Sequence, residues 1–312
     1  MAVIALDLGG TKLAAALFND NGDILFKTTH SLDKKHGTEV GKLISQAVND
    51  LLNKMEAVSA IGICVPGIAH AKSGKVWAPN IPGWDDYPLL EELQRSVNNE
   101  KIKIKIDNDR VCYILGEVLK GNARGCKDAI FLSVGTGIGA GILINNEVLR
   151  GSHDIAGAIG WMALSRPFNE KYISCGDFEY NASGEGIVKV ATEMLESSVY
   201  KKSVLKKINP ELLSAKDVFE AYEMGDELSK KVIANAIECW GMATANLVSL
   251  FNPEKIIFGG GVFGPALKFL NEIYMEAKKW AQPISIQQVK LQGSALGNDA
   301  GLYGAGLLAI RD

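Results

Sequence analysis

The chain has 312 residues, enough for one large domain or two of ordinary size, and 47% of them are hydrophobic against 22% charged. These fractions match the average globular protein and exclude a disordered, collagen-like or low-complexity chain. The formal net charge of −3 comes from 33 Lys and Arg against 36 Asp and Glu, so no basic excess favours nucleic acid as a main partner.

The first part of the chain alternates apolar runs with turn signals. Strands are predicted at residues 3–7, 13–18, 24–28, 60–65 and 102–106. Asn21-Gly22 is a hairpin turn signal between the second and third of them. Apolar residues at i, i+3 and i+4 between Val40 and Leu52 predict an amphipathic helix, and a second helix is predicted at residues 111–120.

The same order of elements begins again further along the chain. Strands are predicted at residues 129–134, 140–144, 147–149 and 256–258. A long helix is predicted at residues 227–251 and a last one at residues 300–309. Ser214 with Asp217 three residues on resembles a capping box, which predicts that a helix begins there.

An internal repeat is the main organisational feature. Residues 5–17, ALDLGGTKLAAAL, and residues 131–143, FLSVGTGIGAGIL, share one design of strand, glycine-threonine turn and strand. A duplicated β-β-β-α-β-α unit predicts an α/β protein of two lobes with a cleft between them. We expect one lobe from residues 1–119 with 296–312, and the other from residues 120–295.

The first glycine turn is a candidate anion site. Glycines allow the backbone N–H groups of a turn to approach an anion closely, and a Thr hydroxyl adds a donor. Asp7, at the end of a strand, is a candidate for holding Mg²⁺ through water. The candidate cofactor-binding residues of this turn are Asp7, Gly9, Gly10, Thr11 and Lys12. An ordinary hairpin is the alternative, and the P-loop pattern GxxxxGK[ST] is absent.

A second glycine turn, with Thr136 and Gly137, repeats the device in the second lobe. It lacks the GxGxxG pattern of a dinucleotide-binding turn. Two such turns facing each other across a cleft would hold the β- and γ-phosphates of one nucleotide. Gly259, Gly260 and Gly261 follow a predicted strand and would let a base or ribose lie against the backbone, although a tight strand-to-helix turn is the alternative.

Asp109 is the candidate general base. A carboxylate at the carboxyl end of a strand can face a cleft and take the proton of a sugar hydroxyl as that oxygen attacks the γ-phosphorus. Asn108 beside it can form hydrogen bonds with neighbouring hydroxyls. The alternative is that Asp107 or Asp109 only caps the following helix.

The sequence resembles the ROK family (repressor, open reading frame, kinase) of bacterial sugar kinases, within the actin and hexokinase ATPase superfamily. Seven stretches carry the resemblance, in the family's order and at its spacing. They are ALDLGGTK, IGICVPG, APNIPGW, IDND, FLSVGTGIGAGI, FNPEKIIFGGGV and GLYGAGLLA. The resemblance covers nearly the whole chain and implies a duplicated actin-like (ribonuclease H-like) ATPase fold with a cleft between its lobes.

The resemblance also implies roles for individual residues. The two glycine turns would bind the phosphates of ATP, with Mg²⁺ held at Asp7, and Gly259 to Gly261 would lie near the adenosine. Asp109 would be the catalytic base. The residues that would contact the sugar are Gly67, Asn80, Asn108, Asp109 and Glu179.

The chain departs from the family pattern after the second glycine turn. Family glucokinases carry Glu and His in a GExGH segment, where this chain has Ala158 and Trp161. Loss of these hydroxyl-reading groups would weaken a site tuned to glucose. Of the cysteines in the family's zinc-binding CxCGxxGCxE cluster only Cys175 remains, so we expect no structural zinc. Trp161 would either stack on a sugar or a glycoside's aglycone, or fill the volume of the missing zinc loop as core packing.

Together these features predict an ATP-dependent sugar kinase, a phosphotransferase that acts on a hydroxyl of a hexose or hexose derivative. By resemblance the default acceptor is the 6-hydroxyl, and a homodimer is a family expectation. One alternative is a transcriptional repressor, whose helix-turn-helix would precede the ATPase core. The first strand at Val3 leaves no room for it. The other is a sugar sensor or degenerate kinase without efficient turnover, which the changes at Ala158 and Trp161 motivate.

The cysteines and the apolar stretches indicate the compartment. Five cysteines, widely spaced and without a CxxC pair, favour a reducing environment over a disulfide framework. The N-terminal run MAVIALDLGG lacks the basic region of a signal peptide, and no apolar stretch reaches the roughly 18 residues of a membrane span. We therefore expect a cytoplasmic protein that binds neither membranes nor nucleic acid.

Overall fold

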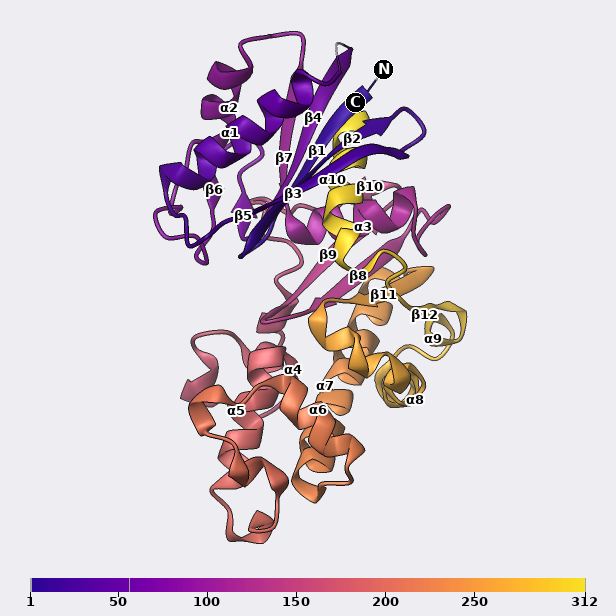
Figure 1. Cartoon of the computed structure of the whole chain (residues 1–312). Coiled ribbons are helices and arrows are strands. Elements are labelled where there is room, and N and C mark those ends of the chain that lie inside the picture. The colour runs from indigo at the N-terminus through magenta and orange to yellow at the C-terminus, as the bar shows by residue number, and fades with distance from the viewer. Residues whose placement is uncertain (1, 56, 312) are drawn as a thin grey trace. The chain divides into compact units, whose positions relative to one another are not determined.

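The computed structural model describes residues 2–55 and 57–311, in which the chain forms two compact units (Figure 1). Unit 1 consists of Met1–Gly125, Val148–Ala156 and Ser294–Asp312, and unit 2 of Cys126–Glu147 and Gly157–Gly293. The predicted lobe boundaries at 119/120 and 295/296 stay a prediction. Among the described residues, no helix combines the length and the apolar character needed to span a membrane.

Unit 1 is built on a five-stranded sheet in the order β3-β2-β1-β4-β7. Its strands are β1 (Ala2–Leu8), β2 (Lys12–Asn19), β3 (Ile24–Ser31), β4 (Val58–Val65) and β7 (Lys103–Asn108). β1 pairs antiparallel with β2 and parallel with β4, and β7 continues the parallel part. A separate two-stranded sheet is formed by β5 (Ile68–Ala69) and β6 (Val76–Trp77).

Helices pack on both faces of the unit 1 sheet. They are α1 (Thr38–Leu52), α2 (Leu89–Val97), α3 (Asp109–Leu119), the 3₁₀ segment η8 (Gly297–Asp299) and α10 (Ala300–Ile310). Ile4 and Leu6 of β1 share a core with α1 and α2, whereas Val3 and Ala5 share a core with α3 and α10. This alternation is that of a strand buried on both faces.

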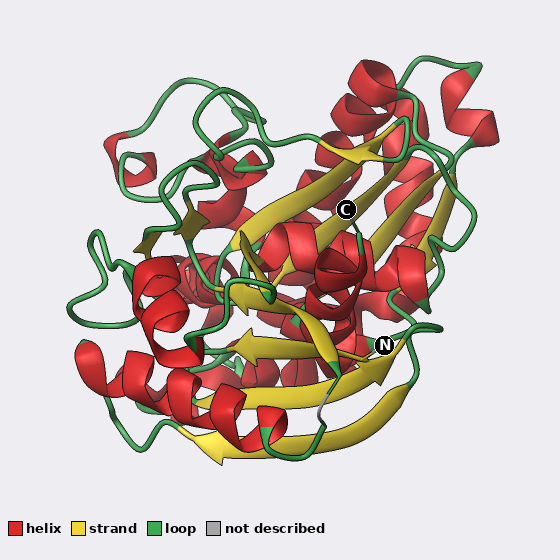
Figure 2. Cartoon of the chain, turned by 90° about the horizontal axis from the view of Figure 1, so that it is seen from above, coloured by secondary structure: helices red, strands yellow, loops and turns green. Residues whose placement is uncertain are grey.

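Unit 2 repeats this sheet in the order β10-β9-β8-β11-β12. The strands of this sheet are β8 (Ala129–Val134), β9 (Ile138–Ile144), β10 (Glu147–Val148), β11 (Lys255–Gly259) and β12 (Lys290–Gly293), and the last residue of β10, Val148, is counted with unit 1. β8 pairs antiparallel with β9 and parallel with β11, as β1 does with β2 and β4. The predicted duplication of a β-β-β-α-β-α unit is therefore confirmed, and the strands of both sheets can be followed in Figure 2.

The helices of unit 2 lie mostly between β10 and β11 along the chain. They are α4 (Asp177–Ala182), α5 (Gly184–Leu195), α6 (Ala215–Glu223), α7 (Glu227–Phe251), α8 (Leu270–Trp280) and α9 (Ser285–Gln288). The 3₁₀ segments are η1 (Ile159–Trp161), η2 (Glu170–Tyr172), η3 (Ser198–Tyr200), η4 (Val204–Lys207), η5 (Pro210–Leu212), η6 (Gly261–Phe263) and η7 (Pro265–Phe269). α7 has the predicted bounds, and the capping box of Ser214 and Asp217 is confirmed at the start of α6.

The core of unit 2 is centred on α7. Trp240 is fully buried, and its ring lies 5.0 Å from that of Phe263, measured between centroids. The indole N–H donates to the carbonyl oxygen of Ala182 at 3.0 Å, which satisfies the polar end of this large apolar side chain. This contact joins α7 to the end of α4, the helix that carries Glu179.

A buried carboxylate joins α3 to the segment ahead of α10. Glu117 is 0% exposed and accepts hydrogen bonds from the N–H groups of Asn122 at 2.7 Å and Ala295 at 3.1 Å, and from the Ser294 hydroxyl at 2.6 Å. A Cβ on Gly121 would lie 2.0 Å from Glu117 Oε2, so glycine is required there. One side chain therefore satisfies donors from two segments that are far apart in the sequence.

Replacing Glu117 by Ala should lower the free energy of unfolding by about 3 kcal/mol or more, because several buried donors lose one acceptor together. Glu117→Gln keeps one acceptor oxygen and should cost about half as much. Urea unfolding followed by circular dichroism measures both changes. The exposed Glu100→Ala is the control, with an expected change below about 0.5 kcal/mol. A similarly small change for Glu117→Ala would contradict the structural role.

Candidate active site

The predicted phosphate turn of unit 1 lies between β1 and β2. Gly9 N donates to the carbonyl oxygen of Lys12 at 2.9 Å, which closes the turn. Gly10, Thr11 and Lys12 are exposed, and no acceptor for the N–H groups of Gly10 and Thr11 is found among the described residues. Asn80, a predicted sugar contact, lies beside the turn, with its Nδ2 3.7 Å from the position of a Cβ on Gly10. The turn therefore presents unpaired donors next to an amide side chain.

Asp7 is the last residue but one of β1, just ahead of this turn, and is half-buried. Burial raises the pKa of its carboxyl to about 6, with the charges of Asp109 and Asp299 adding to the rise and a hydrogen bond with Cys64 opposing it. A Cβ on Gly301 of α10 would lie 2.6 Å from Asp7 Oδ2, so glycine lets the carboxylate approach the helix. A cation beside Asp7 would favour its ionised form.

Two of the polar residues at the junction of β7 and α3 are held by contacts within unit 1. Asn108 is the N-cap of α3, and its Oδ1 accepts from Val111 N at 3.1 Å. The alternative that Asp107 or Asp109 caps this helix is therefore wrong. Asp107 is 0% exposed, and its Oδ2 lies 2.5 Å from Arg150 Nη1.

Asp109 follows as the first residue of α3 and is half-buried. Burial raises the pKa of its carboxyl, and the charge of the Arg110 guanidinium opposes the rise. So does the Arg110 N–H, which donates to Asp109 Oδ1 at 2.8 Å. The Arg110 side chain in turn donates to the carbonyl oxygen of Gly67 at 3.3 Å and to Asn108 Oδ1 at 3.4 Å. The structure thus brings together three of the predicted sugar contacts, Gly67, Asn108 and Asp109.

The predicted phosphate turn of unit 2 lies between β8 and β9. Gly135 N donates to the carbonyl oxygen of Gly137 at 2.9 Å, and Thr136 is exposed. The first residues of α5 support the turn from behind, since Gly184 N donates to Gly135 O at 2.8 Å and Glu185 N to Thr136 O at 3.4 Å. Among the described residues, no acceptor is found for the N–H groups of Thr136 and Gly137.

Glu179, another predicted sugar contact, lies on α4 against this second turn. Its Oε2 accepts from Ile138 N at 2.6 Å, and a Cβ on Gly137 would lie 2.7 Å from the same oxygen. Burial raises the pKa of the Glu179 carboxyl, and the hydrogen bond from Ile138 opposes the rise. Glu179 belongs to unit 2, whereas the other predicted sugar contacts belong to unit 1.

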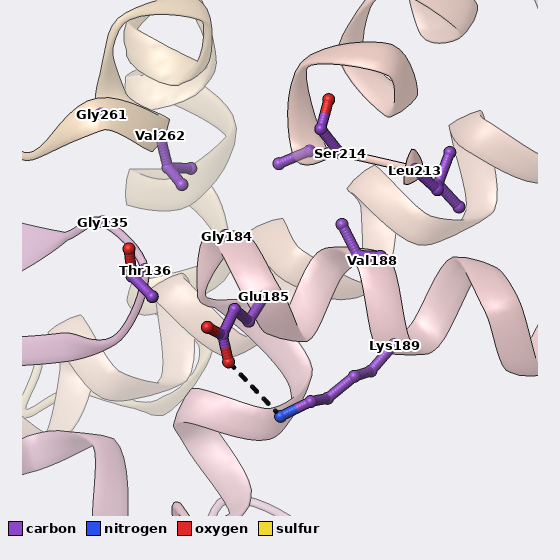
Figure 3. A pocket seen from close by; sticks show the side chains of 11 residues that line it. Gly135, Thr136, Gly184, Glu185, Val188, Lys189, Leu213, Ser214, Gly261 and Val262 are labelled. Carbon is purple, nitrogen blue, oxygen red and sulfur yellow. Dashed lines mark ion pairs between the residues drawn. The ribbon is translucent and has the colours of Figure 1, made fainter. Parts of the chain in front are cut away.

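A pocket of about 660 Å³ lies beside the second turn, within unit 2 (Figure 3). Its lining comes from the turn, the first part of α5, residues 213–215 and residues 261–262. Val188, Leu213 and Val262 supply apolar side chains, and an ion pair of Glu185 and Lys189, 3.7 Å apart, lies along α5. The volume and the mixture of apolar and polar groups are typical of a site for a small organic molecule.

The three glycines after β11 differ in their surroundings. A Cβ on Gly259 would lie 2.3 Å from the ring of Phe131. Gly260 has a φ of +87°, and a Cβ on it would lie 2.4 Å from the carbonyl oxygen of Val134. A Cβ on Gly261 would meet nothing within 4 Å, and this residue lines the pocket. Close packing explains the first two glycines, while the space beside the third is open to a ligand.

The segment that departs from the family's zinc pattern is held by a carboxylate. Asp177, at the start of α4, accepts from Leu164 N at 2.8 Å, Ser165 N at 2.6 Å and Asn181 Nδ2 at 2.7 Å. Over residues 2–55 and 57–311, no group of three or more His, Cys, Asp and Glu side chains is placed to hold a metal. Hydrogen bonds to Asp177 therefore join this segment to α4.

Trp161 lies at the end of η1 and is 58% exposed. The expectation that it fills the volume of the missing zinc loop as core packing is therefore wrong. An exposed indole face can stack on a ring, so the role in sugar or aglycone binding stays a prediction.

Sequence reasoning missed several residues of this site. Arg150 lies far along the chain from Asp107, and no local pattern joins the two. Asp177 belongs to no motif, and its partners are set by the path of the segment before α4. Arg110 did carry a signal, since a cation directly after the candidate base is unusual at the start of a helix.

Residues 3–312 match the sequence profile of the ROK family. A glucokinase of Halalkalibacterium halodurans is 32% identical over 98% of this chain and 94% of that protein. A xylose repressor of Caldicellulosiruptor bescii is 30% identical over 100% of this chain and 78% of that protein. The crystal structure of a ROK family glucokinase from Streptomyces griseus, in complex with glucose and AMPPNP, has a TM-score of 0.78 at 28% identity over 99% of both chains. The actin-like fold is thereby confirmed, and the chain belongs to the ROK family.

Proposed function

We propose that this protein is an ATP-dependent sugar kinase, which transfers the γ-phosphoryl group of Mg·ATP to a hydroxyl of a hexose or hexose derivative, by default the 6-hydroxyl. Similarity to a glucokinase and to a kinase structure with glucose and AMPPNP supports this class of reaction. The observation that carries the proposal is the pair of exposed glycine turns at matching positions of the two sheets. Their unpaired N–H groups suit phosphate oxygens.

In this proposal the pocket of unit 2 takes the adenosine of ATP. The base would pack against Val188, Leu213 and Val262, and the open backbone at Gly261 would allow a close approach. The turn at Thr136 borders the same pocket, so a nucleotide there would place its phosphates at the turn. Gly259 and Gly260 would act only by letting β11 pack against β8.

Asp109 is the base we assign to the reaction. As the acceptor oxygen attacks the γ-phosphorus, a bond from oxygen to phosphorus forms, the bond to the β-phosphate oxygen breaks, and the hydroxyl proton goes to the Asp109 carboxylate. Burial raises the pKa of Asp109, which makes it a stronger base than an exposed Asp. Asn108 and Gly67, which both accept hydrogen bonds from the Arg110 side chain, would orient the sugar beside it.

Asp7 is the residue we assign to Mg²⁺. A carboxylate is an oxygen ligand of the kind that Mg²⁺ takes, often through water. The charges of Asp109 and Asp299 contribute to the raised pKa of Asp7, and a divalent cation would offset that repulsion, so the donor chemistry fits the ion. When bound, Mg²⁺ neutralises charge on the phosphates during transfer.

The similarity to a xylose repressor supports a second candidate, a sugar-responsive regulator without efficient turnover. The deciding experiment incubates the protein with Mg·ATP and a panel of hexoses, amino sugars and glycosides, and follows ADP release. Phosphorylation of any sugar supports the kinase. ATP binding without phosphorylation of any sugar would support the regulator. Specific binding of duplex DNA at physiological salt would independently contradict a function as a kinase alone.

Asp109→Asn should lower kcat by about 10²- to 10⁴-fold and leave the affinity for ATP nearly unchanged, because it removes the proton acceptor and keeps the nucleotide contacts. Steady-state kinetics and an ATP titration measure the two quantities. Asp85→Asn, an exposed residue of the same unit, is the matched control and should behave as wild type. An Asp109→Asn protein with normal turnover would mean that another group is the base.

Asp7→Asn should stabilise the folded protein at high pH. The pKa of Asp7 is raised from 3.8 to about 6, so the folded state binds this proton more tightly than the unfolded state. The contribution of Asp7 to the free energy of unfolding of the wild-type protein therefore falls as the pH rises from about 4 to about 6. Asn removes this dependence, and the variant should gain about 1–3 kcal/mol at pH 8 and little at about pH 3.5.

Urea unfolding of both proteins at the two pH values measures this difference. In the same preparation kcat/KM for Mg·ATP should fall at least about 10-fold, since the residue assigned to the metal is gone. A variant that gains no stability at pH 8 would show that burial and like charge do not act on Asp7 as inferred.

A further inference from the structure

Arg110 stands at a position that disfavours a cation. It is the second residue of α3, and the N-terminus of a helix carries partial positive charge. Its side chain is half-buried, so the guanidinium also loses part of its hydration. A cation with both disadvantages normally lies beside a group of opposite charge.

The partners of the Arg110 guanidinium are uncharged. Nη2 donates to the carbonyl oxygen of Gly67 at 3.3 Å and Nε to Asn108 Oδ1 at 3.4 Å, both long for hydrogen bonds. Asn108 Oδ1 is shared, because it also accepts from Val111 N. In the part of the chain that the structure describes, no carboxylate oxygen lies within 4.0 Å of this guanidinium. With five N–H donors, it has several left over.

Arg150 shows the contrast within the same unit. Its guanidinium lies 2.5 Å from the buried carboxylate of Asp107, so these two charges match each other. The charge of Asp107 is therefore balanced by Arg150, and Asp107 does not balance the charge of Arg110. Asp109 feels the charge of Arg110, yet Asp109 is the residue assigned to the reaction, where it must accept a proton.

We propose that Arg110 binds an anionic group of the acceptor, so that the substrate is a hexose derivative carrying a carboxylate or a phosphate. The inference rests on the proposed kinase function and narrows its substrate class. Both neutral partners of Arg110 belong to residues assigned to the sugar, which places the guanidinium at the sugar end of the site. A planar guanidinium can donate two parallel hydrogen bonds to either anion.

Two matched pairs of sugars serve as probes and distinguish the effect of a negative charge from the effect of the rest of the sugar. Glucose and glucose 1-phosphate differ by a phosphate, and N-acetylglucosamine and N-acetylmuramate differ by a lactyl carboxylate. All four keep a free 6-hydroxyl. Initial rates of ADP release with Mg·ATP give kcat/KM for each probe, and calorimetric titration gives Kd without turnover. The first pair tests a phosphate and the second a carboxylate.

For wild type, kcat/KM of the anionic member of at least one pair should exceed that of its neutral partner by roughly 10- to 150-fold, the range for hydrogen bonds to a charged group. Arg110→Gln keeps a donor for Gly67 and should bring this ratio close to one. Arg110→Lys keeps the charge without the planar fork and should restore part of it. Arg95→Gln removes a positive charge from the surface of α2, where the side chain is 75% exposed, and should leave the ratio unchanged.

A wild-type preference for the neutral member of both pairs overturns the inference and leaves the kinase proposal standing. An equal fall of kcat on both members in Arg110→Gln also overturns it, because the guanidinium would then act on the transferred phosphoryl group. If no sugar is phosphorylated, the kinase proposal fails and the titration decides. If wild type binds an anionic probe more tightly than its neutral partner and Arg110→Gln does not, the role of Arg110 is supported. If wild type binds both members of each pair equally, the inference is wrong.

Discussion

Asp107 is a carboxylate without exposed surface, and Arg150 is the cation that makes its burial tolerable. An unmatched charge at this position would cost several kcal/mol, and the ion pair with Arg150 offsets that cost. Asn108, the next residue, is fixed because its side chain caps α3. Asp109 follows directly as the first residue of α3, and its Oδ1 accepts from Arg110 N.

The two glycine turns show how a duplicated unit can acquire two different tasks. Both turns join the first two strands of a sheet and both are closed by one backbone hydrogen bond. In unit 2 the first residues of α5 donate hydrogen bonds to the turn, and the helices between β10 and β11 help to line a pocket beside it. In unit 1 the corresponding interval between β3 and β4 holds α1, and the carboxylates of Asp7 and Asp109 accompany the turn. The duplication supplies the two turns that we propose to bind phosphate, and the helices between β10 and β11 supply the apolar lining of the pocket.

Local patterns were enough to predict the repeat, most strands, the bounds of α7 and the cap at Ser214, because each depends on residues close in sequence. β12 was missed, since Lys290–Gly293 is short and carries no apolar alternation. The pairing of Arg150 with Asp107 and the contacts of Asp177 depend on the path of the chain between distant segments. The alternative that Trp161 packs in the core was wrong. A large apolar side chain suggests burial, yet Trp161 at the end of η1 is exposed.

The proposed anionic substrate would also change the base. The charge of Arg110 opposes the rise in the pKa of Asp109 while the site lacks an anion. A carboxylate or phosphate bound to Arg110 would offset that charge, and the pKa of Asp109 would rise further, which strengthens it as a proton acceptor. A hydrogen bond to a charged group contributes about 1.5–3 kcal/mol, whereas one between neutral groups contributes about 1 kcal/mol. In the family pattern, Glu and His stand where this chain has Ala158 and Trp161. A chain without these two side chains could still bind its sugar, because the charge of the acceptor would contribute both binding energy and a stronger base.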